Sequence, residues 1–232
     1  MDTPGQLATA LREEILALKY APDEPLREIA LAERFAASRR SVREALARLA
    51  SEGIVSREIN RGARVRRLDT ADVVDLYRVR RLLEIEGASA CASASEEALE
   101  EVQAAFDRLA QTARADQDSL SHAVADTAFH ASVIALAASP RLDQISDQIL
   151  VEMTYAIRLL HRDEVEGAIS AAQVVRDHAR ILESVRARAP EAAVVAVEEH
   201  IFENSARLLR LVEPVPQESR SVVSARTGVR AV

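Results

Sequence analysis

The stretch 37-ASRRSVREALARLASEGIVSREINRGARVRR-67 changes its apolar period partway along, and this change decides the fold of the first part of the chain. In its first half, apolar side chains recur at helical spacing, which predicts a helix with one buried face at Val42, Ala45, Leu46 and Leu49. After Gly53 apolar and polar residues alternate, as they do in a strand. The turn 60-NRG-62 then leads to a return strand at 63-ARVRR-67. We therefore expect a helix followed by a basic two-stranded hairpin.

The start of this helix is predicted from a capping box, in which Ser41 is followed three residues later by Glu44. The box places the first helical residue at Val42 and leaves the preceding turn with Ser38, Arg39 and Arg40.

Two further helices are expected upstream, because residues 7–18 and 27–36 carry apolar stripes and Pro22 and Pro25 separate them. In the second of these, Ile29, Leu31 and Phe35 are available for a core. Helix, helix, turn, capped helix and hairpin follow in the order of a winged helix-turn-helix. We assign this domain to residues 1–67.

The rest of the chain predicts helices alone. Apolar stripes at helical spacing, with breaks at Pro140 and Pro190, indicate helices at about 71–92, 95–114, 118–137, 141–160, 168–188 and 191–212. The fold class is therefore mainly α, an N-terminal winged helix-turn-helix followed by an all-helical antiparallel bundle at residues 70–213. Residues 214–232 contain Pro, Ser and Gly without periodicity and are expected to form a disordered tail.

Charge and cysteine content narrow the class of protein. The net charge is −7, yet residues 34–67 hold ten arginines and three glutamates. A short basic segment in an acidic chain favours binding to nucleic acid at that segment. The single cysteine, Cys91, excludes an internal disulfide and is expected to be a small buried residue. No stretch is apolar enough for a membrane helix, so a cytoplasmic protein is expected.

An aspartate and three histidines point to a metal site. In 126-DTAFH-130 the acid and the imidazole share one helical face. His178 and His200 each lie eleven residues from position 189, so an antiparallel turn at Pro190 would bring them to the same height. Asp126, His130, His178 and His200 could thus bind one divalent ion, with zinc, nickel and manganese as candidates. The alternative is a buried polar network without an ion.

The other two histidines are not expected to be ligands. His122 is four residues before Asp126 and is expected at a partly exposed helix position, and His161, between arginines, is expected at the surface.

The chain resembles a known family in both halves. Residues 31–65, LAERFAASRRSVREALARLASEGIVSREINRGARV, look like the winged helix of GntR-type bacterial transcription regulators. The later segment, from LYRVRRLLEIEGA through DTAFH to the two histidines, resembles their FCD effector-binding domain. This resemblance implies a homodimer on a palindromic operator DNA and a pocket for a small organic acid assisted by a metal. Repression is the usual outcome in the family.

The resemblance also implies roles for individual residues. It assigns DNA contacts in the helix-turn-helix and the wing tip to Ser38, Arg39, Arg43, Arg61 and Gly62. It places Arg80 in the effector pocket, where a guanidinium could hold a carboxylate, although an ion pair with Glu84 is the alternative. Asn204, one turn after His200, is a further candidate for the pocket.

Two enzyme classes compete with this interpretation. A metal-dependent hydrolase with an appended winged helix would use the same ligands, but we expect no inward-facing glutamate to act as a general base beside them. A ferritin-like di-iron protein would need Glu-x-x-His pairs, which the sequence lacks. The sequence therefore predicts a DNA-binding regulator that is not an enzyme.

Overall fold

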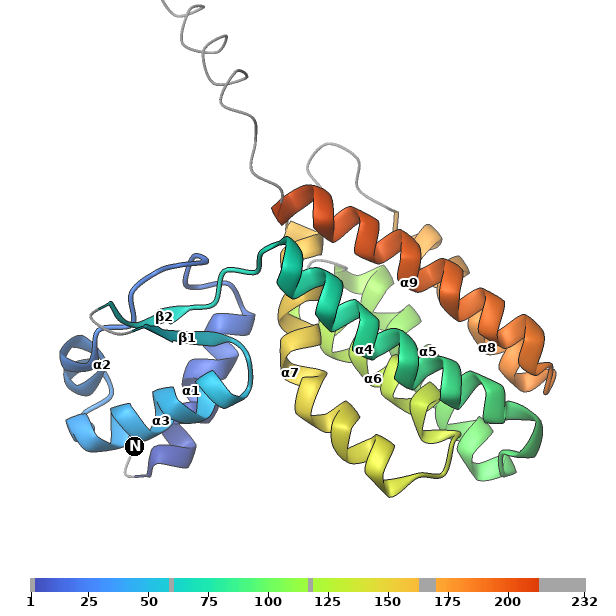
Figure 1. The fold of residues 1–232 in the computed structure, drawn as a ribbon, viewed down its shortest axis with the longest axis horizontal. Coiled ribbons are helices and arrows are strands. Elements are labelled where there is room, and N and C mark those ends of the chain that lie inside the picture. The colour runs from blue at the N-terminus through green and yellow to red at the C-terminus, as the bar shows by residue number, and fades with distance from the viewer. Residues whose placement is uncertain (1–2, 59–60, 117–118, 163–169, 213–232) are drawn as a thin grey trace, which may run out of the picture.

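The computed structural model describes residues 3–58, 61–116, 119–162 and 170–212. Within them the chain forms a small helical unit with a hairpin and a larger bundle of helices, which lie at opposite ends of the molecule (Figure 1). The predicted mainly α fold with a winged helix-turn-helix is confirmed. The expected tail, 214–232, lies outside the described residues.

The first unit contains three helices and one antiparallel hairpin. Their bounds are α1 Pro4–Leu16, α2 Glu28–Arg34, α3 Arg39–Ser51, β1 Val55–Glu58 and β2 Gly62–Val65. In the hairpin Val55 pairs with Val65 and Glu58 with Gly62. The predicted apolar face of α3 is buried against α1, which contributes Leu7, Leu11 and Ile15. In α2 only Leu31 is fully buried, and Ile29, which was expected to be available for the core, is 56% exposed.

The start of α3 differs from the prediction. Ser38, and not Ser41, is the N-cap, and its Oγ accepts a hydrogen bond of 3.0 Å from the backbone N–H of Ser41. The expected capping box does not form, because Glu44 accepts instead from Arg40 one turn earlier. The helix therefore begins at Arg39, three residues before the predicted start. Two serines in similar surroundings made the choice ambiguous from spacing alone.

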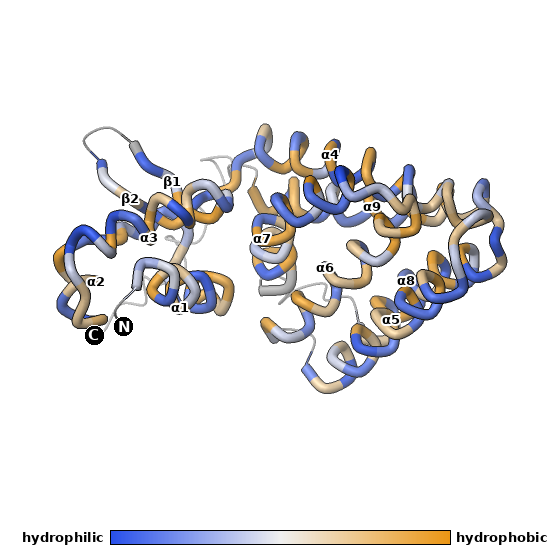
Figure 2. The backbone as a smooth tube through the Cα atoms, turned by 90° about the horizontal axis from the view of Figure 1, so that it is seen from below, coloured by the Kyte–Doolittle hydropathy of each residue, from blue (hydrophilic) through white to orange (hydrophobic). Residues whose placement is uncertain are grey.

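Where the structure describes it, the second unit consists of helices. Their bounds are α4 Thr70–Ser89, the 3-10 turn η1 Ala90–Ser93, α5 Glu96–Asp116, α6 Leu120–Ala135, α7 Pro140–Arg162, α8 Ala171–Arg186 and α9 Pro190–Val212. Asp69 caps α4 in a capping box with Asp72. Helix α4 packs between α9 and α6, and α5 packs against α6 and α8, as Figures 1 and 2 show. Cys91 is buried at the end of α4, as expected.

A glycine allows α4 and α6 to approach closely. A Cβ atom on Gly87 would lie 2.1 Å from the carbonyl oxygen of Val133 and 2.7 Å from the Cα of Ile134. The two backbones therefore touch at this point, where only hydrogen fits. One turn earlier on each helix, the same packing brings Glu84 onto His130.

Helix α7 connects the bundle to the first unit. The hydroxyl of Tyr155 donates a hydrogen bond of 2.7 Å to the carbonyl of Arg66, in the linker between the two units. The Nε of Arg158 donates one of 3.1 Å to the carbonyl of Leu16, at the end of α1. Both side chains are buried, so the two units share a packed boundary. Across the described ranges, no helix is both long and apolar enough to cross a bilayer.

We predict that Gly87→Ala destabilises the chain by roughly 2–4 kcal/mol, because the added methyl group would overlap backbone atoms of α6 that cannot rotate away. Urea denaturation of the full chain measures the change. The matched control is Gly5→Ala in α1, where the added Cβ would meet only the end of Arg48, at 3.8 Å. That variant should stay within about 0.5 kcal/mol of the parent. Equal stability of the two variants would refute the close contact.

Candidate functional site

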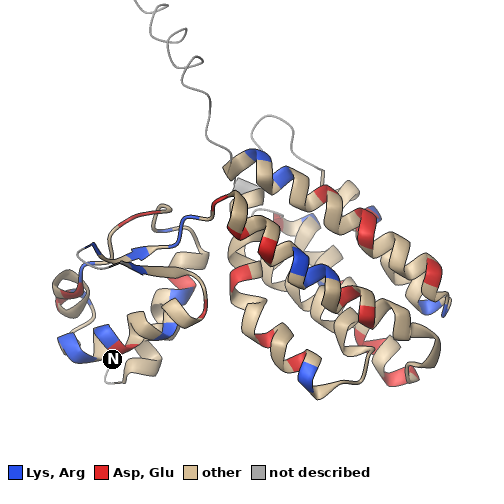
Figure 3. Cartoon of the chain, in the orientation of Figure 1, with Lys and Arg blue, Asp and Glu red and all other residues tan. Residues whose placement is uncertain are grey.

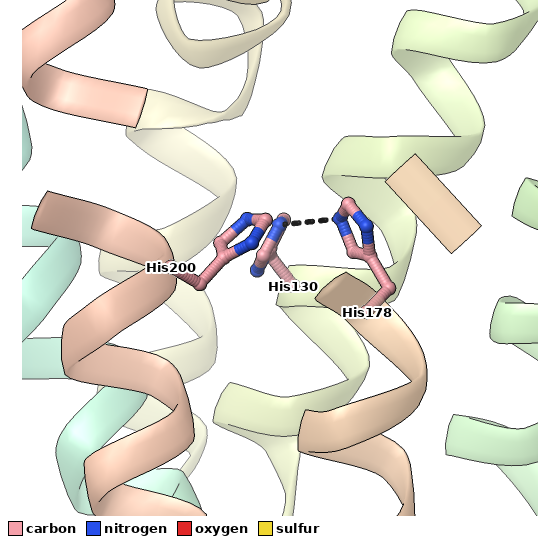
Figure 4. Close-up of side chains that lie close together, drawn as sticks. All are labelled: His130, His178 and His200. Atoms are coloured by element: carbon pink, nitrogen blue, oxygen red, sulfur yellow. Dashed lines mark hydrogen bonds between the residues drawn. The ribbon is translucent and has the colours of Figure 1, made fainter. Parts of the chain in front are cut away.

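Three histidines from three helices meet inside the bundle (Figure 4). His130 projects from α6, His178 from α8 and His200 from α9, each from the apolar stripe of its helix. One ring nitrogen of each lies within 4.8 Å of the others, and the ring centroids of His178 and His200 are 4.5 Å apart. The turn at Pro190 folds α8 and α9 back on each other, so the two equal spacings do bring these rings together.

Asp126 lies against two of the three histidines. Its Oδ1 is 3.5 Å from the Nε2 of His130, and its Oδ2 is 3.3 Å from the Nε2 of His178. Asp126 is 6% exposed, so little water can solvate its carboxylate. The four residues named from the sequence are therefore neighbours, although Asp126 contacts two imidazoles and not the third.

Hydrogen bonds fix the tautomers of two of the rings. The Nδ1 of His130 is 2.8 Å from Glu84 Oε2, and the Nδ1 of His178 is 2.8 Å from the carbonyl of Val174. A carbonyl and an ionised carboxylate only accept, so each Nδ1 must carry the hydrogen. In the neutral form of each ring, Nε2 then presents its lone pair to the centre of the cluster.

These two lone pairs face each other. The Nε2 atoms of His130 and His178 are 3.3 Å apart, which is hydrogen-bond distance, and when both rings are neutral neither nitrogen has a hydrogen to donate. The negatively charged Asp126 faces both of them. With both rings neutral such an arrangement is electrostatically unfavourable, and a proton or a metal cation at the Nε2 atoms relieves it. The donor set of imidazole nitrogens and a carboxylate therefore fits a divalent metal ion.

Burial and charge keep the donors in the protonation states that a metal requires. Burial lowers the pKa of His130 and of His200, the latter well below its usual value, and the nearby Arg80 adds to both shifts. Burial alone would raise the pKa of Asp126, but His178, His130 and Arg80 lower it well below its usual value. At neutral pH His130 and His200 are thus neutral and Asp126 is ionised.

Asn204 competes for one nitrogen of His200. Its Nδ2 is 2.9 Å from the Nε2 of His200, and its Oδ1 accepts from Arg207 at 3.1 Å. The bond from Arg207 fixes the amide so that its nitrogen faces the imidazole. His200 can use its Nε2 as a ligand only if this amide moves aside.

Arg80 is buried beside the cluster and has spare hydrogen-bonding capacity. It is 1% exposed, and its Nε donates to Glu84 Oε1 at 2.6 Å. Both roles predicted for Arg80 thus have support, because its Nε forms the ion pair with Glu84 and a second nitrogen of the guanidinium does not take part in it. The Nη2 of Arg80 is buried without a hydrogen-bond partner among the residues described. A buried guanidinium N–H of this kind is expected to have a ligand or water.

Glu84 is the residue that the sequence analysis missed. It was named only as a possible partner of Arg80, and no inward glutamate was expected near the ligands, but Glu84 is fully buried and contacts His130. Burial would raise its pKa, but Arg80 and His130 lower it to about 2, so it is ionised. Its burial could have been predicted from helical spacing, because it continues the buried stripe of α4 formed by Tyr77, Arg80 and Gly87.

The expectation for His122 is also wrong. It is completely buried, and its Nδ1 lies 3.2 Å from Thr112 Oγ1 on α5, because the buried face of α6 is wider than one stripe. It is not part of the three-histidine group. The side chain of His161 is not among those that the structure describes.

Figure 3 shows where the basic residues lie along the helices and the hairpin of the first unit, and among them Arg39, Arg43 and Arg61 are exposed. Arg39 is in the first turn of α3, and Arg43 one turn later pairs with Glu28 of α2 at 3.1 Å. At the hairpin, Gly62 has a φ of 74°, a left-handed conformation suited to glycine. Arg39, Arg61 and Gly62 line one groove between the helices and the hairpin.

A winged helix-turn-helix joined to a helical bundle is the architecture of a class of DNA-binding transcription regulators. Comparison with known families agrees with this class. Residues 3–65 match the bacterial regulatory proteins of the gntR family, and residues 75–203 match the FCD domain. The chain belongs to the GntR family of bacterial transcription regulators and carries an FCD domain.

Relatives agree along most of the chain. A probable D-xylose utilization operon transcriptional repressor from Paenarthrobacter nicotinovorans is 28% identical, and 76% of each chain is covered. An HTH-type transcriptional regulator in an unstable DNA locus of Streptomyces ambofaciens is 30% identical over 82% of this chain and 92% of that one.

Solved structures show the same fold. A structure described as a transcriptional regulator GntR from Rhodococcus sp. RHA1 has a TM-score of 0.76 at 24% identity, covering 89% of this chain and 97% of that one. E. coli McbR/YncC has a TM-score of 0.69 at 21% identity, with 90% and 98% covered.

The lowered histidine pKa values predict that the metal-free chain loses stability on mild acidification. Because the folded-state pKa values of His130 and His200 lie below 6.5, their contribution is complete above that pH and is lost as the pH falls. The expected slope is at most about 1.4 kcal/mol per pH unit for each group. The ionised Asp126 does not change in this window, since its pKa is lowered below 3.8.

Urea denaturation in the presence of a chelator at pH 7.5 and 5.5 measures this loss. His200→Gln should reduce the difference between the two pH values, because it removes one of the two titrating groups. An unchanged difference in that variant would show that His200 takes up its proton equally in the folded and unfolded chain.

Proposed function

We propose that this GntR-family regulator represses transcription as a homodimer on a palindromic operator, and that a small carboxylate metabolite bound at a metal site in the bundle controls its operator affinity. We also propose the domain division 1–67, 70–213 and 214–232. The observation that supports control by a metal most directly is the 3.3 Å approach of two imidazole Nε2 atoms, which both offer lone pairs when the rings are neutral.

In this proposal Asp126, His130, His178 and His200 hold a divalent ion. Nitrogen and carboxylate donors favour zinc, and nickel and manganese remain alternatives. When bound, such an ion would act as a Lewis acid toward a carboxylate oxygen. The role of these residues is to keep their lone pairs and negative charge directed at one point.

Arg80 is proposed to bind the carboxylate of the effector. Its Nη2 is directed into the buried region without a partner in the described ranges, and its charge complements an organic acid. Asn204 is proposed as a second contact, because releasing His200 would leave its amide free to bind an effector oxygen. Binding of the effector would then depend on both the ion and the guanidinium.

The DNA-binding residues proposed are Ser38, Arg39, Arg43, Arg61 and Gly62. Ser38 and the first turn of α3 present N–H groups and positive charge to a phosphate. Arg39 and Arg43 follow on one exposed side, where arginine can read guanine in the major groove. The hairpin tip would enter the adjacent minor groove through Arg61 and Gly62.

A second copy of the chain is proposed to cover an apolar surface on α4 and α9. These helices lie side by side and expose Val74, Leu82, Val195 and Phe202, the last of these to 72%. A groove between them is lined by further apolar side chains, including Tyr77, Ile201 and Leu209. The same patch on two copies can form a two-fold interface, which a palindromic site requires.

Repression is proposed because the Paenarthrobacter relative is named a transcriptional repressor. A cytoplasmic location is proposed because operator DNA lies there. The competing hydrolase function has less support. The inward glutamate that it would need exists, but both oxygens of Glu84 are occupied by Arg80 and by the outer nitrogen of His130. It therefore cannot act as a base at the centre of the cluster without leaving both partners, and we propose that the chain is not an enzyme.

For DNA binding, we predict that Arg39→Ala and Arg43→Ala each weaken specific operator binding by about 1–3 kcal/mol, because each removes a guanidinium from the recognition surface. Fluorescence anisotropy with a palindromic operator measures the loss. Arg108→Ala, which removes an exposed arginine from α5, changes the net charge equally and should bind like the parent. If all three variants bound alike, α3 would not be the recognition helix.

For the metal site, we predict that the full chain retains close to one zinc ion per protomer after dialysis and that His178→Ala abolishes this retention, since it removes a ligand. Elemental analysis gives the metal content. The control His122→Asn alters a buried histidine outside the cluster and should keep its zinc. A parent chain that bound neither zinc, nickel nor manganese would leave the four residues as a polar network only.

A further inference from the structure

Glu84 has a position that the proposed function does not use. It is completely buried on α4, and its two oxygens have different partners: Oε1 accepts from Arg80 Nε at 2.6 Å and Oε2 from His130 Nδ1 at 2.8 Å. The carboxylate thus joins the proposed effector-binding arginine to a proposed metal ligand, without facing the centre of the cluster itself.

We propose that Glu84 is a positioning residue that sets the tautomer of His130 and, through it, the affinity of the histidine cluster for a divalent ion. The part of this inference that concerns the ion rests on the proposed metal site. The part that concerns the tautomer applies to the metal-free chain as well.

The carboxylate is held in a single orientation. Arg80 pins one oxygen, and the backbone contact of Gly87 with Val133 keeps α4 at a fixed height on α6. The second oxygen can only accept, so the hydrogen of the His130 ring stays on Nδ1 and the lone pair stays on Nε2. Outer carboxylate partners of this kind orient ligand histidines and increase their basicity.

His178 reaches the same state by a different route. Its Nδ1 donates to the backbone carbonyl of Val174 within its own helix, so its tautomer does not depend on another side chain. His130 is therefore the ligand whose tautomer a single substitution can change. This difference makes the role of Glu84 testable without altering any ligand.

Glu84→Gln should reverse the tautomer of His130. Arg80 still needs an acceptor, so the new amide oxygen remains with its Nε and the amide nitrogen faces His130 Nδ1. That nitrogen donates, and Nδ1 must then accept. The ring hydrogen moves to Nε2 and points into the cluster, where it blocks the lone pair.

Removing Arg80 as well should restore the original tautomer. In Arg80→Met/Glu84→Gln nothing holds the amide oxygen, so the amide can turn and accept from Nδ1 of His130. The double variant removes both charges of the Arg80–Glu84 pair together, so neither is left buried without the other, which favours folding. A residue with a merely structural role would not be rescued by loss of its own partner.

The first measurement is ¹⁵N NMR of the histidine rings in the metal-free full chain, which reports the protonated nitrogen. We expect the hydrogen of His130 on Nδ1 in the parent, on Nε2 in Glu84→Gln and again on Nδ1 in the double variant. Should Glu84→Gln not fold, Arg80→Met/Glu84→Leu replaces it and should show a mixture of tautomers, since no acceptor remains. A fixed Nδ1–H in every variant would overturn the inference.

The second measurement is zinc affinity by competition with a chelating dye. Glu84→Gln should bind zinc at least about 10-fold and up to about 100-fold more weakly than the parent. The control Glu86→Gln removes the same charge from an exposed position of α4 and should bind like the parent. Arg80→Met should improve zinc binding more in the Glu84→Gln background than in the parent, which completes the double-mutant cycle.

The outcomes separate this inference from the proposed function. Zinc binding that is equal in the parent and Glu84→Gln would overturn the role of Glu84 and leave the metal site standing. A parent chain that binds no zinc, nickel or manganese would remove the metal site and the claim on affinity together, whatever the tautomer of His130.

Discussion

An arginine, two carboxylates and three imidazoles are enclosed in the helical bundle, where a charge without a partner costs several kcal/mol. The ion pair of Arg80 with Glu84 compensates two of these charges, and the hydrogen bond from Glu84 to His130 ties the pair to the cluster. The charge of Asp126 faces only imidazoles. Much of the bundle interior therefore depends on one chain of polar contacts.

The same helices carry contacts from this cluster toward the DNA-binding unit. Thr127, between Asp126 and His130 on α6, lies 3.2 Å from Thr154 on α7, oxygen to oxygen. The next residue of α7, Tyr155, bonds to the linker at Arg66. Hydrogen bonds of two consecutive α7 residues thus connect α6, beside the candidate metal site, with the linker at the base of the winged helix.

The helices and their buried faces could be predicted from the sequence because periodicity is a local property. The stripe on α3 and the breaks at Pro140 and Pro190 required no knowledge of other helices. The exact start of α3 was harder to predict, because Ser38 and Ser41 are both favourable N-cap residues. Which of the two serines caps the helix depended on the partner of Glu44. The burial of His122 was missed because α5 covers a second side of α6.

For the candidate site, the sequence by itself determined which helices carry the four polar residues and that His178 and His200 share a height, because both follow from rise per residue and one turn. The contact of Glu84 with His130, 46 residues away, and the 3.3 Å approach of two Nε2 atoms depend on tertiary packing and could not be predicted from the sequence. Spacing along a helix predicts on which face of that helix a residue lies. The partner of a buried polar group is set by how closely two helices approach, and here Gly87 fixes that approach.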